Sequence, residues 1–405
     1  MLDKLVLVLF FNLNLFAFSG MLIDKKTAKP IENAMVIDRK KTVYTHTDGS
    51  FNIETNSKIL HVKAHGYRPF TIDTTTKKTF FELEPIKVKA LYLTFWGANN
   101  NSKTLKKLLE IVDNTEINAI VVDMKNEYGS TMFLTNFKKA NSYGAHLQRT
   151  NYNIKKFIQI MKEHNVYTIA RIVTFKDELQ AMYNPDYAIR KSNGKIWRNK
   201  DNVAWVDPFD KRSHRYTINI AKESAKVGFD EINFDYIRFP AKKGLVLKKE
   251  STQQNRVKAI SSFLKLAKKE LDPYGVFISV DTYGNVCWSK DDNNIGQTIK
   301  SLSKYADYIA PMLYPSGFAS GSFNVAYPAK HPYIVIYRSI KHIEKIINPK
   351  RVRPWLQNFR DYKSERIPYT KYEISQQIKA TKDIDANGYM MWSPASKYSL
   401  HCFIN

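Results

Sequence analysis

Cysteines and acidic residues are scarce in this sequence of 405 residues. It contains two cysteines, Cys287 and Cys402, which excludes a scaffold built on several disulfides. One bridge between them and two free thiols are both compatible with the sequence. The 38 Asp and Glu residues are outnumbered by 63 Lys and Arg, which gives a net charge of +25. This charge favours an anionic partner, unless the lysines simply form a solvated basic surface.

The motifs of several common enzyme classes are also absent. The sequence has no Gly-rich phosphate loop, HExxH helix, GxSxG turn or zinc-type spacing of Cys and His, and His214, His331 and His342 are isolated. We therefore expect no cofactor and no metal site. Nucleic-acid binding would require a basic stripe interleaved with aromatic residues. The lysines are instead spread over predicted helices, so no nucleic-acid partner is expected.

Long apolar runs are missing after the first 19 residues. The run from residue 5 to residue 18 follows a lysine and is short for a transmembrane helix. Ala17 and Ser19 supply the small residues of a cleavage site before Gly20. Residues 1–19 therefore predict a signal peptide. We expect an exported protein, in the periplasm, the cell envelope or the extracellular space, with peripheral association with the envelope as one form.

Residues 20–85 have the texture of short strands joined by turns, with turn residues at Asp48-Gly49 and His65-Gly66. This pattern predicts a small all-β sandwich. The Thr-Asp-Gly-Ser-Phe turn at residues 47–51 and the later Gly66-Tyr67 pair resemble the carboxypeptidase regulatory-like domain. The resemblance implies a structural or adhesive accessory without catalytic residues.

Strands and helical segments alternate along residues 86–405. The predicted strands are Ala90–Trp96, Ala119–Asp123, Tyr167–Val173, Glu231–Asp235, Val276–Asp281, Tyr308–Leu313, Arg353–Gln357 and Gly388–Trp392. The predicted helices between them include Lys103–Val112, Ile154–Glu163, Ser213–Lys226, Arg256–Leu271, Gly296–Lys304, Ser339–Ile347 and Tyr372–Lys382. Links from strand to helix are long and links from helix to strand are short. The sequence therefore predicts an α/β fold, a (β/α)8 TIM barrel with its site at the carboxyl ends of the strands.

Three of the predicted strands end in aspartate. Asp123, Asp235 and Asp281 follow alternating apolar and polar residues, so their side chains are expected at one mouth of the barrel. We take these three as the catalytic candidates. A metal ion held by the same three carboxylates is the alternative.

Further residues near the strand ends suit sugar binding, because flat rings stack on pyranose faces and polar groups bond to hydroxyls. Arg238 would also hold a neighbouring carboxylate ionised, and Glu127 is an alternative acid or base. The substrate-binding candidates are Trp96, Glu127, Tyr236, Arg238, Tyr283, Trp288, Tyr314, Gln357 and Trp392.

Carboxylates and aromatic rings together favour cleavage of glycosidic bonds. That reaction needs one protonated and one ionised carboxyl group, and clustering of carboxylates raises the pKa of one of them. The expected partner is a polysaccharide, with acidic or cell-envelope glycans favoured by the basic charge. The alternative is a lectin-like protein that holds a glycan without cleaving it.

Five motifs resemble a bacterial glycoside-hydrolase-like family first described as domain of unknown function 4015. They are GFDEINFDYIRFP (228–240), ISVDTYG (278–284), DYIAPMLYPS (307–316), RPWLQNF (353–359) and GYMMWSPASKY (388–398). The resemblance implies a (β/α)8 fold and glycan hydrolysis. The fourth strand is also distantly similar to the chitinase pattern, but Ile237 stands where chitinases carry their catalytic Glu. The substrate-assisted chitinase mechanism therefore does not carry over.

Overall fold

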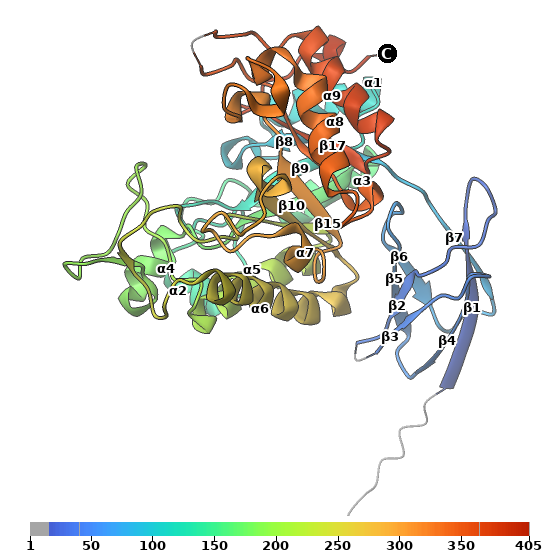
Figure 1. The fold of residues 1–405 in the computed structure, drawn as a ribbon. Helices are drawn as coiled ribbons and strands as arrows, with labels where there is room; N and C mark the ends of the chain where they lie inside the picture. The colour runs from blue at the N-terminus through green and yellow to red at the C-terminus, as the bar shows by residue number, and fades with distance from the viewer. Residues whose placement is uncertain (1–15, 40, 364, 405) are drawn as a thin grey trace, which may run out of the picture.

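The computed structural model describes residues 16–39, 41–363 and 365–404 (Figure 1). An N-terminal β region precedes a closed barrel of eight parallel strands surrounded by helices. In Figure 1 the β region, in blue, lies on the side of the barrel opposite the loop around helix α4 (Glu178–Tyr183). The predicted fold class is thereby confirmed.

The N-terminal region is built from two small sheets with a core of their own. One sheet has the strand order β4-β1-β7 and the other β3-β2-β5-β6. Leu22, Ile53, Leu60 and Val62 are fully buried between them. The strands are β1 (Phe16–Asp24), β2 (Met35–Ile37), β3 (Thr42–Tyr44), β4 (Ser50–Thr55), β5 (Ile59–Lys63), β6 (Phe70–Asp73) and β7 (Phe80–Leu83). The resemblance to the carboxypeptidase regulatory-like domain stays a prediction.

Strand β1 overlaps the predicted signal peptide. Ala17 pairs with Glu54 and Ser19 with Asn52 across the antiparallel ladder to β4. Cleavage before Gly20 would therefore remove the first four residues of this strand. Residues 1–15 of the predicted signal lie outside the described part of the chain.

The barrel closes in the order β10-β12-β14-β15-β16-β17-β8-β9. Every neighbouring pair is parallel, which the alternation of strands and helices required. The barrel strands are β8 (Val88–Leu93), β9 (Ala119–Lys125), β10 (Tyr167–Val173), β12 (Glu231–Asp235), β14 (Phe277–Tyr283), β15 (Tyr308–Met312), β16 (Trp355–Gln357) and β17 (Gly388–Trp392).

Each barrel strand sends alternate side chains to two different cores. On β12, Ile232 and Phe234 pack outward in the layer between the strands and the helices. Glu231, Asn233 and Asp235 alternate with them and bond to groups inside the barrel. The period-two pattern of the sequence therefore predicted correctly which side chains of β12 point into the barrel and which point toward the helices.

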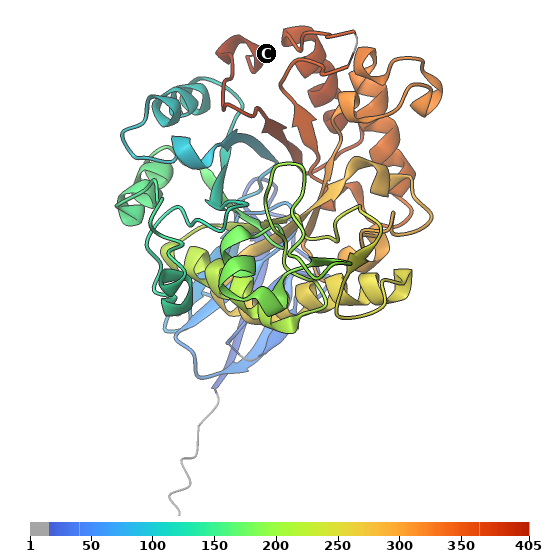
Figure 2. The ribbon, with the colours of Figure 1, turned by 90° about the vertical axis from the view of Figure 1, so that its left-hand side faces the viewer.

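The helices cover the outside of the barrel, as Figure 2 shows from the side of the strand-to-helix loops. They are α1 (Lys103–Asn114), α2 (Lys138–Ser142), α3 (Ile154–Glu163), α4, α5 (Lys211–Val227), α6 (Gln253–Leu271), α7 (Ile299–Leu302), α8 (Pro332–Ile343) and α9 (Lys371–Asp383). A two-stranded ribbon of β11 (Arg190–Lys191) and β13 (Leu245–Val246) joins two of the long loops. None of the helices in the described ranges is long and apolar enough to cross a membrane.

Several element boundaries differ from the sequence prediction. Strands β9 and β14 continue two residues past Asp123 and Asp281, so of the three strands predicted to end in aspartate only β12 does. Strand β8 ends at Leu93, because the Thr94 side chain accepts a hydrogen bond from Gly97 and starts a 3-10 turn. The helix predicted from Gly296 shrinks to α7, since Gly296 has φ +82° and cannot belong to a right-handed helix. Helix α8 begins early at Pro332, whose fixed φ suits the first helical turn.

Asp235 owes its position to the two ends of its strand. Helix α5 stops at Gly228, which adopts φ +106° and turns the chain into β12. At the other end, Tyr236 adopts φ +49°, which is rare for a residue with a side chain. Backbone strain of this kind clusters at functional sites.

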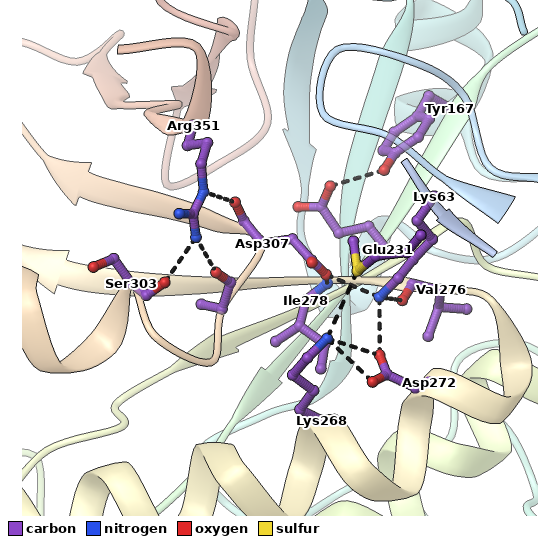
Figure 3. Close-up of polar contacts among 12 residues, drawn as sticks. Lys63, Tyr167, Glu231, Lys268, Asp272, Val276, Ile278, Ser303, Asp307 and Arg351 are labelled. Atoms are coloured by element: carbon purple, nitrogen blue, oxygen red, sulfur yellow. Dashed lines mark hydrogen bonds and ion pairs between the residues drawn. The ribbon is translucent and has the colours of Figure 1, made fainter. Parts of the chain in front are cut away.

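The N-terminal region caps the end of the barrel away from the mouth (Figure 1), and Figure 3 shows the polar contacts of Lys63 at this junction. Lys63 is fully buried, and its Nζ lies 3.0 Å from Asp272 Oδ1 and 3.2 Å from Asp307 Oδ2. It also donates to the carbonyl of Val276, the residue before β14. Burial opposes ionisation of Asp307, but the charges of Lys63 and Lys268 outweigh it and lower the pKa. The cap is therefore joined to the barrel through a buried ion cluster.

A second buried ion pair lies just inside the same end of the barrel. Arg353 donates to both carboxylate oxygens of Glu231, at 2.9 and 2.7 Å, and Tyr167 donates to Glu231 at 2.8 Å. The Arg353 guanidinium also lies over the ring of Tyr308, whose hydroxyl accepts the N–H of Gly66 from the cap. These contacts fill the floor of the barrel.

Both cysteines are buried free thiols. Of the two possibilities that the sequence left open, the structure has two free thiols and no disulfide between them. Burial raises the pKa of Cys287 to about 12, which keeps its thiol protonated and unreactive.

We expect Lys63→Met to lower the free energy of unfolding by about 3 to 5 kcal/mol, because it leaves the buried Asp307 carboxylate without its cation. Denaturant unfolding followed by circular dichroism measures the change. The control is Lys379→Met, which removes an exposed lysine that pairs with Asp383 on α9 and should unfold like the wild type. Equal midpoints for the two variants would show that the ion cluster does not hold the cap on the barrel.

Candidate functional site

A cavity of about 200 Å³ opens at the carboxyl ends of the barrel strands. Residues from six barrel strands and the turns after them form its wall. They are Arg171, Asp235, Tyr236, Arg238, Asp281, Tyr283, Met312, Tyr314, Trp355 and Trp392. The cavity therefore lies where the sequence predicted the site.

Arg171 is the central charged group of this cavity. It projects from β10 into the barrel and is 5% exposed. Its Nη1 donates to Asp123, and its Nε and Nη2 both donate to Oδ2 of Asp235. The two carboxylates raise the pKa of Arg171 well above its ordinary value in spite of burial, so the guanidinium stays charged. One buried cation therefore orients two buried carboxylates.

Asp235 is held at both of its oxygens. Oδ2 accepts from Arg171 Nε at 3.1 Å, and Oδ1 accepts the backbone N–H of Tyr236 at 2.6 Å. A carboxylate that accepts charged and backbone N–H donors is stabilised in its ionised form. Asp235 is therefore a fixed anion on the cavity wall.

Asp281 has the opposite character. Burial raises its pKa well above the ordinary value, and the charge of Asp235 raises it further. Its Oδ1 accepts hydrogen bonds from Nδ2 of Asn233 and from Nε1 of Trp355, both at 2.8 Å. Its Oδ2 accepts no hydrogen bond from the part of the chain that the structure describes. A proton on Asp281 therefore belongs on Oδ2, the oxygen left free for a ligand.

Asp123 lies behind Arg171 and does not line the cavity. The hydroxyl of Tyr92 donates to its Oδ2 at 2.5 Å, and Arg171 donates to Oδ1. Burial raises the pKa of Asp123, while Arg171 and Tyr92 offset part of that rise. Its contacts make Asp123 a residue that orients Arg171.

Aromatic rings lie beside these charged groups. Trp392 stacks on Tyr92 with 4.0 Å between ring centroids, and Trp355 meets Trp392 edge to face at 5.5 Å. The Arg171 guanidinium lies 5.3 Å from the Trp392 ring. A flat apolar face thus lies close to the charged groups, which is the arrangement that a pyranose ring requires.

The structure brings most of the predicted site residues together. Those that line the cavity are Asp235, Asp281, Tyr236, Arg238, Tyr283, Tyr314 and Trp392.

Four predicted binding residues lie away from the cavity wall. Trp96 is 68% exposed on the 3-10 turn after β8, and Glu127 is half-buried on the loop after β9. Trp288 stacks on His342 and donates to Ser339, so it belongs to the packing of α8.

The fourth residue, Gln357, is fully buried and bonds to Ser316 and Gln377. Its side-chain amide bonds to Ser316 in the loop after β15, and its backbone N–H and carbonyl bond to the side chain of Gln377 on α9. Gln357 does not line the cavity.

Sequence reasoning missed several groups of the site, above all Arg171, Tyr92 and Trp355. A signal existed for Arg171, because an arginine at an inward position of the apolar strand YTIARIV needs a buried partner. Tyr92 and Trp355 gave no such signal, since aromatic residues are common in strands of any role.

Arg171 also bears on the alternative of a metal site. Its guanidinium lies between Asp123 and Asp235, in the place that a cation shared by these carboxylates would take. Among the described side chains, no group of three His, Cys, Asp or Glu residues is arranged to hold a metal ion.

Residues 90–398 match the sequence profile of a family described as "Putative glycosyl hydrolase domain", domain of unknown function 4015. The match covers the barrel from β8 to the segment after β17. The chain belongs to this family. The resemblance drawn from the five motifs is thereby confirmed, and membership points to hydrolysis of glycosidic bonds in general. No curated protein sequence matches the chain.

Solved structures with similar folds include the glycoside hydrolase domain of PgaB (BpsB) from Bordetella bronchiseptica, at TM-score 0.59 and 13% identity, covering 77% of this chain and 95% of that one. A hypothetical protein from Ruminiclostridium thermocellum is 36% identical over 47% of this chain and 96% of its own, at TM-score 0.42. The spore cortex-lytic enzyme SleL from Bacillus cereus has TM-score 0.48 and 11% identity, covering 93% and 90%. The PgaB (BpsB) domain therefore shares the barrel fold with this chain.

The raised pKa of Asp281 predicts a pH-dependent cost to stability. A folded-state pKa above the unfolded value contributes stability at low pH, which is lost as pH rises through the folded pKa. The Asp281→Asn side chain cannot ionise, so the wild type should lose stability relative to this variant as pH rises. The difference in their free energies of unfolding should change by about 1.4 kcal/mol for each unit by which the folded-state pKa of Asp281 exceeds its unfolded-state pKa. Denaturant unfolding at pH 4, 6 and 8 measures the difference. A difference that stays constant over this range would mean that Asp281 is ionised like an ordinary aspartate.

Proposed function

We propose that the protein hydrolyses glycosidic bonds of a polysaccharide by acid-base catalysis, with Asp281 as the acid and Asp235 as the ionised partner. The observation that carries the proposal is the contrast between these two carboxyl groups on one cavity wall. Asp235 is pinned as an anion by Arg171, whereas burial and that anion raise the pKa of Asp281. Two carboxyl groups in opposite protonation states are what glycoside hydrolysis requires.

Asp281 donates its proton to the oxygen of the leaving sugar. Asn233 and Trp355 donate hydrogen bonds to Oδ1 and fix the plane of the carboxyl group. The Oδ2–H therefore points to the cavity, where a glycosidic oxygen would accept it. When the bond breaks, the proton moves to the leaving alcohol and Asp281 is left as a carboxylate.

Asp235 stabilises the positive charge that develops on the anomeric carbon, either by attacking that carbon or by taking a proton from the attacking water. Arg171 keeps the carboxylate ionised, and the N–H of Tyr236 fixes its second oxygen. Because both contacts are preformed, the carboxylate needs no reorganisation during the reaction.

The size of the cavity favours a polymer of which a single sugar unit occupies the cavity. Its volume of about 200 Å³ is below the ~300 to 1,000 Å³ of typical small-molecule pockets. A single sugar ring would lie against Trp392 and Tyr314, and the rest of the chain would extend along the loops at the mouth. The export signal predicted for residues 1–19 would bring the enzyme to polysaccharides outside the cytoplasm.

We expect Asp235→Asn and Asp281→Asn each to lower kcat by at least about a hundredfold, because a neutral amide neither stabilises the cation nor donates a proton. Reducing ends released from a panel of neutral and acidic bacterial polysaccharides measure turnover, and binding should stay within a few-fold of wild type. Asp201→Asn is the control, since Asp201 is a half-exposed aspartate that binds Lys176 outside the cavity. A wild type that binds a polymer but releases no reducing ends would support the lectin-like alternative instead.

The pH profile should reveal the proton on Asp281. Because the pKa of Asp281 is raised, kcat/KM should fall on the alkaline side as Asp281 loses its proton. Asp281→Asn should remove the alkaline limb from its residual activity. An alkaline limb that persists in this variant would assign the acid to another residue.

A further inference from the structure

One cation of the cavity has no acidic partner. Arg238 lines the cavity together with Asp235 and Asp281, yet it forms no ion pair with any carboxylate of the described chain. Arg171, in contrast, is neutralised by two aspartates. The positive charge of Arg238 is therefore left for something that enters the cavity.

Arg238 is held rigidly by aromatic rings. Its guanidinium carbon lies 5.0 Å from the centroid of Trp205, 5.2 Å from Tyr236 and 4.6 Å from Tyr283. Nη1 donates to the carbonyl of Phe239 at 3.1 Å, and Nη2 donates to the Tyr283 hydroxyl at 3.0 Å. These contacts fix the plane of the guanidinium and thus the direction of its remaining N–H groups.

The free donors of Arg238 suit an anion with two oxygens. Its Nε–H reaches no acceptor in the described ranges, and one hydrogen on each Nη remains besides the two bonds above. A side chain that is only 9% exposed incurs a large cost for an uncompensated charge, which the rings offset in part. A guanidinium fork binds a carboxylate through two parallel N–H···O bonds, and this removes the rest of the cost.

The loop that carries Arg238 extends the positive charge beyond the cavity. It follows β12 at the mouth of the barrel, and Lys242, Lys243 and Lys249 are exposed on it. Glu250 is the single acidic residue between Tyr236 and Thr252. These exposed lysines add to the positive charge of the loop that carries Arg238, which favours the approach of an anionic polymer.

We propose that the cavity binds a carboxylate-bearing sugar, such as a uronic acid residue of an acidic polysaccharide, and that Arg238 binds its carboxylate. The proposal rests on the glycan hydrolysis proposed above and names its substrate class. Arg238 then fixes which face of the sugar ring turns toward Asp235 and Asp281.

The test compares polymers that differ only in charge. Polygalacturonate, alginate and hyaluronan are each paired with their own carboxyl-reduced form, which keeps the backbone and loses the anion. Reducing-end release gives kcat and KM, and calorimetry gives Kd. The variants are Arg238→Met, and Arg238→Lys, which keeps the charge without the fork. The control is Arg212→Met, because Arg212 also stacks on a tyrosine, 4.3 Å from the Tyr187 ring, but lies outside the cavity.

We expect the wild type to bind and cleave at least one acidic polymer with a KM roughly 10- to 100-fold below that of its reduced partner, as a charged hydrogen-bonded pair allows. Arg238→Met should raise KM for the acidic polymer by the same factor and leave the reduced polymer unchanged. Arg238→Lys should fall between these values, and Arg212→Met should behave as wild type. Unchanged melting temperatures would show that the variants fold.

Three results would overturn the proposal: equal handling of both members of every pair, equal loss on both members in Arg238→Met, or no binding of any acidic polymer. Cleavage of the neutral polymers without a preference for charge would refute this substrate class and leave the hydrolase function intact. A preference for the acidic polymer in Kd, dependent on Arg238 but without cleavage of any polymer, would refute hydrolysis and leave the carboxylate site intact.

Discussion

The charge of the buried Arg171 guanidinium is the interaction on which the site depends. It holds Asp123 on one side and Asp235 on the other, and all three side chains are at most a tenth exposed. Removing any one of them would leave a buried charge without its partner, which is far costlier than losing a surface ion pair. The ionised state of Asp235 therefore follows from the packing of the barrel interior, and its negative charge in turn raises the pKa of Asp281.

The barrel separates this site from its structural ion pairs. Near the mouth, charged groups keep oxygens or N–H groups open to the cavity, as Asp281 and Arg238 do. Near the floor, Arg353 and Glu231 satisfy each other, and Lys63 of the cap closes the end of the barrel through Asp272 and Asp307. Strained backbone at Tyr236 lies at the mouth, where geometry serves the site. Stability and chemistry thus occupy opposite ends of one fold.

Much of this arrangement follows from local sequence patterns. Alternation of apolar and polar residues in EINFD predicts which side chains of β12 enter the barrel, and loop lengths predict which end carries the site. The same patterns placed Asp235 and Asp281 at one mouth. The boundary of β8 and the short α7 were not predicted, because they depend on the cap formed by Thr94 and on the positive φ of Gly296.

Long-range pairing is what the sequence could not reveal. Lys63 meets Asp272 and Asp307 more than 200 residues away, and nothing local distinguishes it from the many solvated lysines. Trp288 was predicted at the rim together with Trp392, but its ring packs against His342 instead. Rings at strand ends look alike in sequence, and only the packing of the helices decides which of them face the cavity.

The central claim is that Asp281 carries a proton beside an ionised Asp235. Infrared difference spectroscopy on protein with isotope-labelled aspartate tests this directly, because a protonated carboxyl and a carboxylate have separate stretching bands. At neutral pH the wild type should show a band of a protonated carboxyl that is absent from Asp281→Asn and retained in the Asp201→Asn control. A wild-type spectrum with carboxylate bands alone at that pH would contradict the account.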